Sequence, residues 1–186
     1  FTSALPGALM VGCTTMGEIS PKGSTDASMS VLAMGRPCRA AAERIPDLDG
    51  FRFADGGPLM SRLAAGLGLS CDELDPKRHV VLTLTDGLST NQEQLFASLG
   101  EAVPELALVG GSAGDDFEML ATHCFVGTDA GSGGGAVILL EPGVPFEPFA
   151  IHQYSPAGDD VVVTGADPSR RLLTELNGWP ALLELS

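Results

Sequence analysis

The central part of the chain carries the clearest pattern of hydrophobic and polar positions. Residues 79–85 are rich in β-branched side chains and end at Asp86 and Gly87, which predicts a strand followed by a turn. Apolar residues then recur at helical spacing and predict a helix with one apolar face: Leu95, Phe96, Leu99 and Val103. We expect this helix to begin with a capping box over residues 90–93 and to stop at Pro104.

A second strand is expected directly after this helix. Residues 106–109 form an apolar run, and the order strand, helix, strand predicts two parallel strands joined by a crossover. Both strands then end at the same edge of the sheet, so Asp86 should neighbour the glycine-rich residues 110–116. Open α/β sheets bind their ligands at this edge, and we expect a site there.

The remaining patterns predict a mixed sheet. Residues 58–69 and 168–176 should be helical, and residues 36–45 should form either a short helix or an irregular crossover. The other expected strands, with a glycine-rich hairpin turn at 129–135, cover residues 30–34, 121–126, 136–140, 149–153 and 160–164. Because several of these have antiparallel character, we predict an α/β fold of mixed β-sheets with flanking helices.

Two segments of the chain resemble each other. Residues 8–18 and 106–116 each read as an apolar strand, a glycine, small and hydroxyl residues, a second glycine and an acid. Without a gap, Gly12, Thr14 and Glu18 match Gly110, Ser112 and Asp116; with one gap, Gly17 and Glu18 match Gly114 and Asp115. We predict two related halves made by duplication. The first half would then need a strand and helix ahead of Phe1, so we expect an N-terminal piece to be missing.

Composition narrows the classes of function. The 186 residues are 44% hydrophobic and 18% charged, enough for a folded domain with its own core. The formal net charge of -14 opposes binding to nucleic acid or to anionic membranes, and no apolar run has the length of a transmembrane helix. The four cysteines form no CxxC pair, so we expect neither a zinc site nor a disulfide framework. We predict reduced thiols, a cytoplasmic location and no cofactor or metal.

The two glycine-rich segments have the chemistry to hold a zwitterion. Backbone N–H groups in a sharp glycine turn can bind a carboxylate, and Glu18, Asp115 or Asp116 can bind an amine. The alternative for each segment is a tight connection between packed strands. The predicted ligand-binding residues are Gly12, Cys13, Thr14, Thr15, Gly17, Glu18, Asp86, Gly110, Gly111, Ser112, Gly114 and Asp115.

A nucleophile is the main alternative chemistry. Cys13 or Ser112, with Thr14 and Thr15 as further candidates, could attack an acyl group, and residues 110–114 nearly match the GxSxG elbow. Two features disfavour catalysis. A helix should follow such an elbow directly, but residues 115–118 lead toward a predicted strand. In addition, the histidines that could act as a base lie in or beside predicted strands rather than in the loops. These histidines are His79, His123 and His152.

Metal binding is also disfavoured. His123 and Cys124 are adjacent on a predicted strand and therefore point to opposite faces. Asp47, Asp49 and Asp55 lack the glycine and glutamate spacing of an EF-hand, so we interpret them as a solvated turn.

Three segments, in order, resemble the FIST sensory domain, which occurs in bacterial signal-transduction proteins and in an F-box protein. Residues 11–19 (VGCTTMGEI) resemble its first signature and residues 109–115 (VGGSAGD) its second. Residues 163–167, with residues 176–182, resemble the junction into the FIST C-terminal domain. The chain departs from the family pattern at Thr14-Thr15, where a Ser-Thr pair is usual, and at Asn177, where an aspartate is usual.

The resemblance implies both a domain layout and a function. Residues 1–176 would be a FIST N-terminal domain without its first strand and helix, and residues 177–186 would begin the C-terminal domain. The implied function is an input module of a bacterial signalling protein that binds a small polar ligand such as an amino acid. Its partners would be the C-terminal FIST domain and a downstream signalling protein. Two alternatives stay open: a hydrolase-like enzyme that uses Cys13 or Ser112, and a scaffold that contacts proteins without a small ligand.

Overall fold

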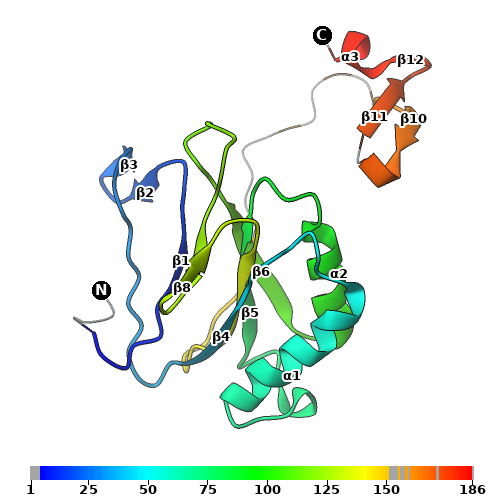
Figure 1. The fold of residues 1–186 in the computed structure, drawn as a ribbon. Coiled ribbons are helices and arrows are strands. Elements are labelled where there is room, and N and C mark those ends of the chain that lie inside the picture. The colour runs from blue at the N-terminus through cyan, green and yellow to red at the C-terminus, as the bar shows by residue number, and fades with distance from the viewer. Residues whose placement is uncertain (1–4, 151–154, 156–157, 159, 171, 186) are drawn as a thin grey trace. The chain divides into compact units, whose positions relative to one another are not determined.

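The computed structural model describes residues 5–150, 155, 158, 160–170 and 172–185 (Figure 1). The chain separates into two compact units, Phe1–Pro148 and Phe149–Ser186. The first unit contains the predicted strand–helix–strand segment together with both glycine-rich segments, so it holds all of the predicted ligand-binding residues.

A four-stranded mixed sheet forms the centre of the first unit. In hydrogen-bonded order its strands are β4 (Arg39–Ile45), β9 (Gly135–Glu141), β5 (Val80–Asp86) and β6 (Ala107–Ala113). β5 and β6 run parallel and are joined through α2 (Gln92–Ala102), whereas β9 is antiparallel to both of its neighbours. The parallel pair with its helical crossover is confirmed, as is the α/β class with mixed sheets.

Two helices cover one face of this sheet. α1 (Gly56–Gly66), which confirms the helix expected over residues 58–69, packs beside α2 (Figure 1). The layer between helices and sheet is aliphatic, and each buried leucine contributes about 1.5–3 kcal/mol of transfer free energy. Its buried side chains include Leu59, Leu63, Leu95, Leu99, Val81 and Leu139. In the part of the chain that the structure describes, no helix has the length and apolar character needed to cross a membrane.

A second, smaller sheet contains the strand of the first glycine-rich segment. Its antiparallel strands lie in the order β1 (Val11–Cys13), β7 (Cys124–Val126) and β8 (Asp129–Gly131). A separate hairpin of β2 (Glu18–Ser20) and β3 (Gly23–Thr25) follows β1. β7 lies next to β4 and β9, and Arg44 Nε of β4 pairs with Asp129 Oδ1 of β8 at 2.8 Å. The small sheet is therefore attached to the main sheet.

The second unit is a short antiparallel sheet with one helical turn. It consists of β10 (Val163–Asp167), the 3-10 turn η3 (Pro168–Arg170), β11 (Leu172–Leu176), β12 (Trp179–Pro180) and α3 (Ala181–Glu184). Asn177 and Gly178 have φ values of 50° and 82°, which a tight two-residue hairpin turn requires. Asparagine tolerates this left-handed conformation, so its presence in place of aspartate is compatible with the turn.

Two segments expected as helical contain strands instead. Residues 36–45 were expected as a short helix or irregular crossover but contain β4, and residues 168–176 were expected as a helix but contain η3 and β11. The alanines of β4 favour a helix by propensity. Their small size is used in packing, because a Cβ built on Gly66 would lie only 2.8 Å from the Ala41 Cβ. Tertiary packing overrides local propensity here.

Other boundaries also differ from the expectations. Residues 30–34 form no strand, and the glycine-rich residues 129–135 are not a hairpin turn, because β8 begins at Asp129 and the turn lies at residues 127–128. β6 continues through residues 110–113, which were expected in a loop. α2 begins with Asn91 at its N-cap, one residue later than the predicted box implies.

The remaining strand expectations are met in whole or in part. Residues 79–85 and 136–140 are confirmed by β5 and β9, and residues 121–126 contain β7. Residues 160–164 overlap the start of β10. Of the strand expected over 149–153, residues 151–153 lie outside the described residues, and residues 149–150 are not in a strand.

The predicted duplication is not confirmed. β1, from the first glycine-rich segment, pairs antiparallel with β7 in the small sheet. β6, from the second segment, pairs parallel with β5 in the main sheet. Similar sequences therefore occupy different strand environments, and the two segments do not form equivalent halves of one sheet.

Candidate functional site

The two glycine-rich segments touch each other although they are far apart in the sequence. The backbone N–H of Gly114 donates a hydrogen bond to the Thr14 carbonyl oxygen at 3.0 Å. A Cβ built on Gly114 would lie 2.3 Å from the Cγ of Met16 and 3.1 Å from its backbone N, so glycine lets the two segments approach without displacing Met16. The first segment thus lies against the end of β6.

The end of β5 lies beside the second segment. Asp86 stands opposite Ala113 in the parallel register, and a Cβ built on Gly87 would lie 2.3 Å from the Ala113 carbonyl oxygen. The expectation that these two strand ends are neighbours is confirmed. Their role in binding a ligand stays a prediction.

Gln92, in the first turn of α2, connects the ends of both strands. Its Nε2 donates to the Asp86 carbonyl oxygen at 2.7 Å, and its Oε1 accepts a hydrogen bond from the Ser112 hydroxyl at 3.2 Å. Sequence reasoning missed this residue. The available signal was its position at the start of the crossover helix, where a side chain can reach back to the strand end that precedes it.

Asp86 is buried, with 7% of its surface exposed, and its carboxylate is already hydrogen-bonded. Oδ1 accepts from the Thr122 hydroxyl at 2.6 Å and from the Leu88 backbone N–H at 2.8 Å. Thr122 is itself buried and stands just ahead of β7. Asp86 therefore fixes Thr122, just before β7, to the end of β5.

Asp115 is engaged by its own loop. Its carboxylate accepts hydrogen bonds from the backbone N–H groups of Met119, Leu120 and Ala121, at 3.2, 2.6 and 3.1 Å. The bond from Leu120, above all, lowers the pKa of Asp115 below its ordinary value. The charge of Asp115 thus stabilises the turn between β6 and β7.

Glu18 is the acid of the first segment and is half-buried. Its Oε1 accepts a hydrogen bond from the Thr15 hydroxyl at 2.8 Å. Thr14 is fixed on both sides: its Oγ1 accepts from the His123 backbone N–H at 3.0 Å, and its backbone N–H donates to the His123 carbonyl at 2.9 Å. Gly17, which lies between Thr14 and Glu18 in the sequence, has a φ of 115°, a conformation suited to glycine.

The predicted glycines differ in what surrounds them. A Cβ on Gly12 would lie 2.5 Å from the Phe125 ring, and a Cβ on Gly110 would lie 2.0 Å from the Thr83 carbonyl oxygen. These two positions allow close packing. Gly111, in contrast, is exposed, and a Cβ there would meet no atom within 4 Å. The space beside Gly111 and the exposed Ser112 is therefore open.

Comparison with known families identifies the chain. The family model of the FIST N domain matches residues 1–179. The chain belongs to the FIST N domain family. These are sensory-type domains of signal transduction, and the family is not a known enzyme family. No match was found among curated proteins or among solved structures.

The candidate nucleophiles of this FIST N domain have partners that do not activate them. Burial, and then the nearby Glu18 carboxylate, raise the pKa of the Cys13 thiol, so the reactive thiolate is disfavoured. The Ser112 hydroxyl donates to an amide oxygen, which is not a base. Among the described residues no histidine is hydrogen-bonded to the Cys13 thiol or to the Ser112 hydroxyl. His79 is buried, and its Nδ1 accepts a hydrogen bond from the Asp75 backbone N–H. His152 lies outside the described residues.

The acidic turn before α1 is held by local hydrogen bonds. Asp47 accepts from the Gly50 backbone N–H at 3.0 Å, and Asp49 accepts from the Ser89 hydroxyl at 2.7 Å. Asp55 pairs with Arg52 at 3.2 Å. Within the described ranges, no three His, Cys, Asp or Glu side chains are grouped so that they could hold a metal ion.

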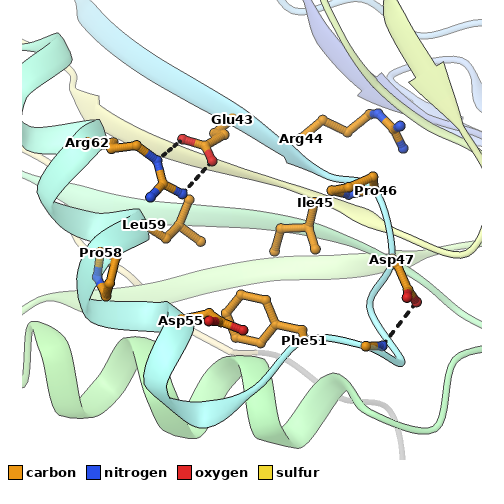
Figure 2. A pocket seen from close by; sticks show the side chains of 11 residues that line it. Glu43, Arg44, Ile45, Pro46, Asp47, Phe51, Asp55, Pro58, Leu59 and Arg62 are labelled. Carbon is orange, nitrogen blue, oxygen red and sulfur yellow. Dashed lines mark hydrogen bonds and ion pairs between the residues drawn. The ribbon is translucent and has the colours of Figure 1, made fainter.

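A hollow of about 260 Å³ lies between β4 and the start of α1. Figure 2 shows its apolar side chains, Ile45, Phe51 and Leu59, and the ion pair between Glu43 and Arg62 at 2.6 Å. None of the predicted ligand-binding residues lines it. The hollow and the contact between the glycine-rich segments are therefore separate features of the FIST N domain.

Proposed function

We propose that this FIST N domain is the ligand-binding input module of a signalling protein and that its ligand is a small zwitterion such as an amino acid. The observation that carries the proposal is the contact between Gly114 and Thr14, which joins the two glycine-rich segments. A ligand that touches both segments would be gripped by groups from two separate sheets.

The exposed end of β6 suits the carboxylate of such a ligand. Among the described strands β6 has β5 as its single neighbour, so its outer edge presents backbone N–H groups without a partner strand. Space beside Gly111 is open, and the Ser112 hydroxyl is exposed next to it. Backbone N–H groups are suitable donors to a carboxylate, and the Ser112 hydroxyl would donate to it after leaving the Gln92 amide oxygen.

Glu18 suits the ammonium end of the ligand. Of the predicted acids, Asp86 is buried against Thr122, and Asp115 accepts three backbone hydrogen bonds from its own loop. Glu18 is half-buried and its carboxylate accepts one hydrogen bond, from Thr15. It therefore keeps more acceptor capacity for an ammonium group than the other two.

A bound ligand transmits a signal only if it binds one arrangement of the protein better than another. A ligand held by both segments would favour the arrangement in which the first segment touches the end of β6. We propose that a C-terminal FIST domain and a downstream protein read this arrangement in the bacterial cytoplasm.

Thermal unfolding of the 186-residue chain tests the proposal. Each member of a panel of amino acids, simple amines and small carboxylates is added at millimolar concentration. A ligand present at about 100 times its Kd stabilises the folded state by about 2.7 kcal/mol, which raises Tm by about 5–11 °C for a chain of this length. We expect such a shift with amino acids and a much smaller one with compounds that carry only one of the two charges.

Two matched variants locate the site. Glu18→Gln removes the charge at constant size and should abolish the shift, whereas Glu105→Gln, an exposed position just before β6 at the far end of that strand, should keep it. A shift that survives Glu18→Gln contradicts the assigned role of Glu18. If no compound shifts Tm of the folded chain, the ligand proposal fails and the protein-contact scaffold becomes the better interpretation.

A further inference from the structure

β1 and β7 bring two cysteines into a cross-strand pair. Cys13 stands directly opposite Cys124 in the antiparallel register, so both side chains point to the same face of the small sheet. Both are free thiols in the structure. Neither cysteine lines the hollow beside α1. Cys13 is among the predicted ligand-binding residues, but the proposed ligand contacts lie at Gly111, Ser112 and Glu18.

The hydrogen-bond pattern shows that this pair occupies a narrow position in the ladder. The Thr14 N–H donates to the His123 carbonyl at 2.9 Å, and the Gly127 N–H donates to the Met10 carbonyl at 2.7 Å. Bonded and non-bonded pairs alternate along antiparallel strands, which makes Cys13–Cys124 a non-bonded pair. Such pairs have Cα atoms about 4.5 Å apart, inside the range of about 4.4–6.8 Å that a disulfide spans.

The two thiols differ in their access to solvent. Cys124 is 1% exposed, and its thiol lies 3.6 Å from the Leu84 carbonyl oxygen. Cys13 is only half-buried, so an oxidant in solution reaches it first. Burial, followed by the charge of the Cys13 thiolate, raises the pKa of Cys124 to about 11, so Cys124 reacts second and as the thiol.

We propose that Cys13 and Cys124 form an oxidation site, at which a hydroperoxide converts the two thiols into an intramolecular disulfide. Because the pKa of Cys13 is raised, its thiolate is a minor form at neutral pH and the reaction is slow. This thiolate attacks hydrogen peroxide, forms a sulfenic acid and releases hydroxide. The Cys124 thiol then attacks the sulfenic sulfur, the S–S bond forms, and one water leaves with the thiol proton. Two thiols are oxidised and one peroxide is reduced to two waters. A dithiol such as dithiothreitol reverses the reaction.

The disulfide would fix the first glycine-rich segment to the main body of the unit. Cys13 directly precedes Thr14, and Cys124 follows the segment that Asp86 holds through Thr122. Oxidation therefore locks β1 against β7 next to the Gly114 contact. This inference does not depend on whether a zwitterion binds there.

Peptide mapping under non-reducing conditions tests the proposal on the 186-residue chain. Cleavage after glutamate places the four cysteines on four different peptides, because Glu18, Glu43, Glu73 and Glu118 separate them. We expect hydrogen peroxide to link the peptide of Cys13 to that of Cys124 with loss of two hydrogen atoms, and dithiothreitol to separate them. The rate should rise with pH, because the thiolate reacts and the pKa of Cys13 is raised.

Variants and an unfolded control keep the test decisive. The double variant Cys38→Ser, Cys71→Ser retains only the pair and should still form the link, with Tm higher by about 4–16 °C in the oxidised form. Cys13→Ser, at a half-buried position, should form no link while circular dichroism reports a folded chain. The proposal is overturned if the folded chain keeps four titratable thiols in peroxide. It is also overturned if the folded chain forms the same mixture of disulfide links as the chain unfolded in concentrated urea.

Discussion

The contact between the two glycine-rich segments predicts a large effect for Gly114→Ala. The new Cβ would lie 2.3 Å from Met16 Cγ, whereas carbon atoms in contact are about 3.5–4.0 Å apart. The Met16 side chain must therefore move away, and its backbone N, 3.1 Å from the new Cβ, must shift slightly as well, which costs about 1–3 kcal/mol for an overpacked site. Such a loss lowers Tm by about 2–12 °C for a chain of this length.

The matched control is Gly111→Ala in the same segment. A Cβ at Gly111 meets no atom within 4 Å, so this variant should stay within about 0.5 kcal/mol of the parent chain. The double variant Gly114→Ala, Met16→Ala removes the clashing Cγ and should recover most of the stability lost in the single variant. Urea denaturation monitored by circular dichroism gives all the free energies of unfolding, and the cycle isolates the coupling between the two positions.

Equal stability of Gly114→Ala and Gly111→Ala would refute this reasoning. It would mean that the first segment does not lie against Gly114 in solution. Loss of stability in Gly114→Ala without rescue by Met16→Ala would also count against the contact, because the cost would then arise elsewhere in the loop.

Three further predictions concern the surroundings of the site. Thr122→Val removes the hydroxyl that donates to the buried Asp86 carboxylate and should cost about 1–3 kcal/mol in urea denaturation, with Thr122→Ser close to the parent chain. Hydrogen bonds lower the pKa of Asp115 in the folded state, so its carboxylate stabilises the fold fully above the ordinary pKa of 3.8. This stabilisation is lost as the pH falls through the lower folded-state pKa. Asp115→Asn should therefore reduce the dependence of the unfolding free energy on acid pH, as measured in unfolding titrations. Leu99→Ala, at a fully buried position of α2, should cost about 2–5 kcal/mol, whereas Leu32→Ala, 82% exposed, should change the free energy of unfolding little; equal effects would contradict the packing of α2.

The parts of the fold that could be predicted are those in which local and tertiary preferences agree. In β5 the β-branched run suits a strand that is covered on both faces, and in α2 the apolar spacing matches the buried face that carries Leu95 and Leu99. The family resemblance rested on three short motifs, around Gly12, around Gly110 and at residues 163–167 with 176–182, and it is confirmed by the match over residues 1–179.

The errors occurred where packing partners lie far away in the sequence. Residues 36–45 read as a short helix or an irregular crossover, and β4 forms there because seven of its residues pair with β9. Residues 30–34 read as a strand by composition, yet they find no partner strand in the described part of the chain. A strand is stabilised by its neighbours, and the sequence of the strand alone does not reveal whether a neighbour exists.

The site illustrates the same limit. That Asp86 neighbours Ala113 follows from one crossover, which the sequence reveals. The contact of Gly114 with Thr14 depends on the pairing of β1 with β7, two short strands that local pattern does not connect. The bridging role of Gln92 depends on where α2 starts relative to both strand ends.

Similar motifs in this chain have acquired different physical tasks. The acid of the second segment, Asp115, orders its own loop, and the last glycine of that segment, Gly114, admits Thr14 and Met16. In the first segment Glu18 accepts a single side-chain hydrogen bond. Glu18 is half-buried whereas Asp116 is exposed to solvent, so Glu18 is the acid better placed to bind an ammonium group. One such acid, together with the exposed edge of β6, suits a single ammonium and a single carboxylate. On the proposed function, this asymmetry favours a monoamino monocarboxylic acid over a diamine, so a diamine should raise Tm less than an amino acid of similar length.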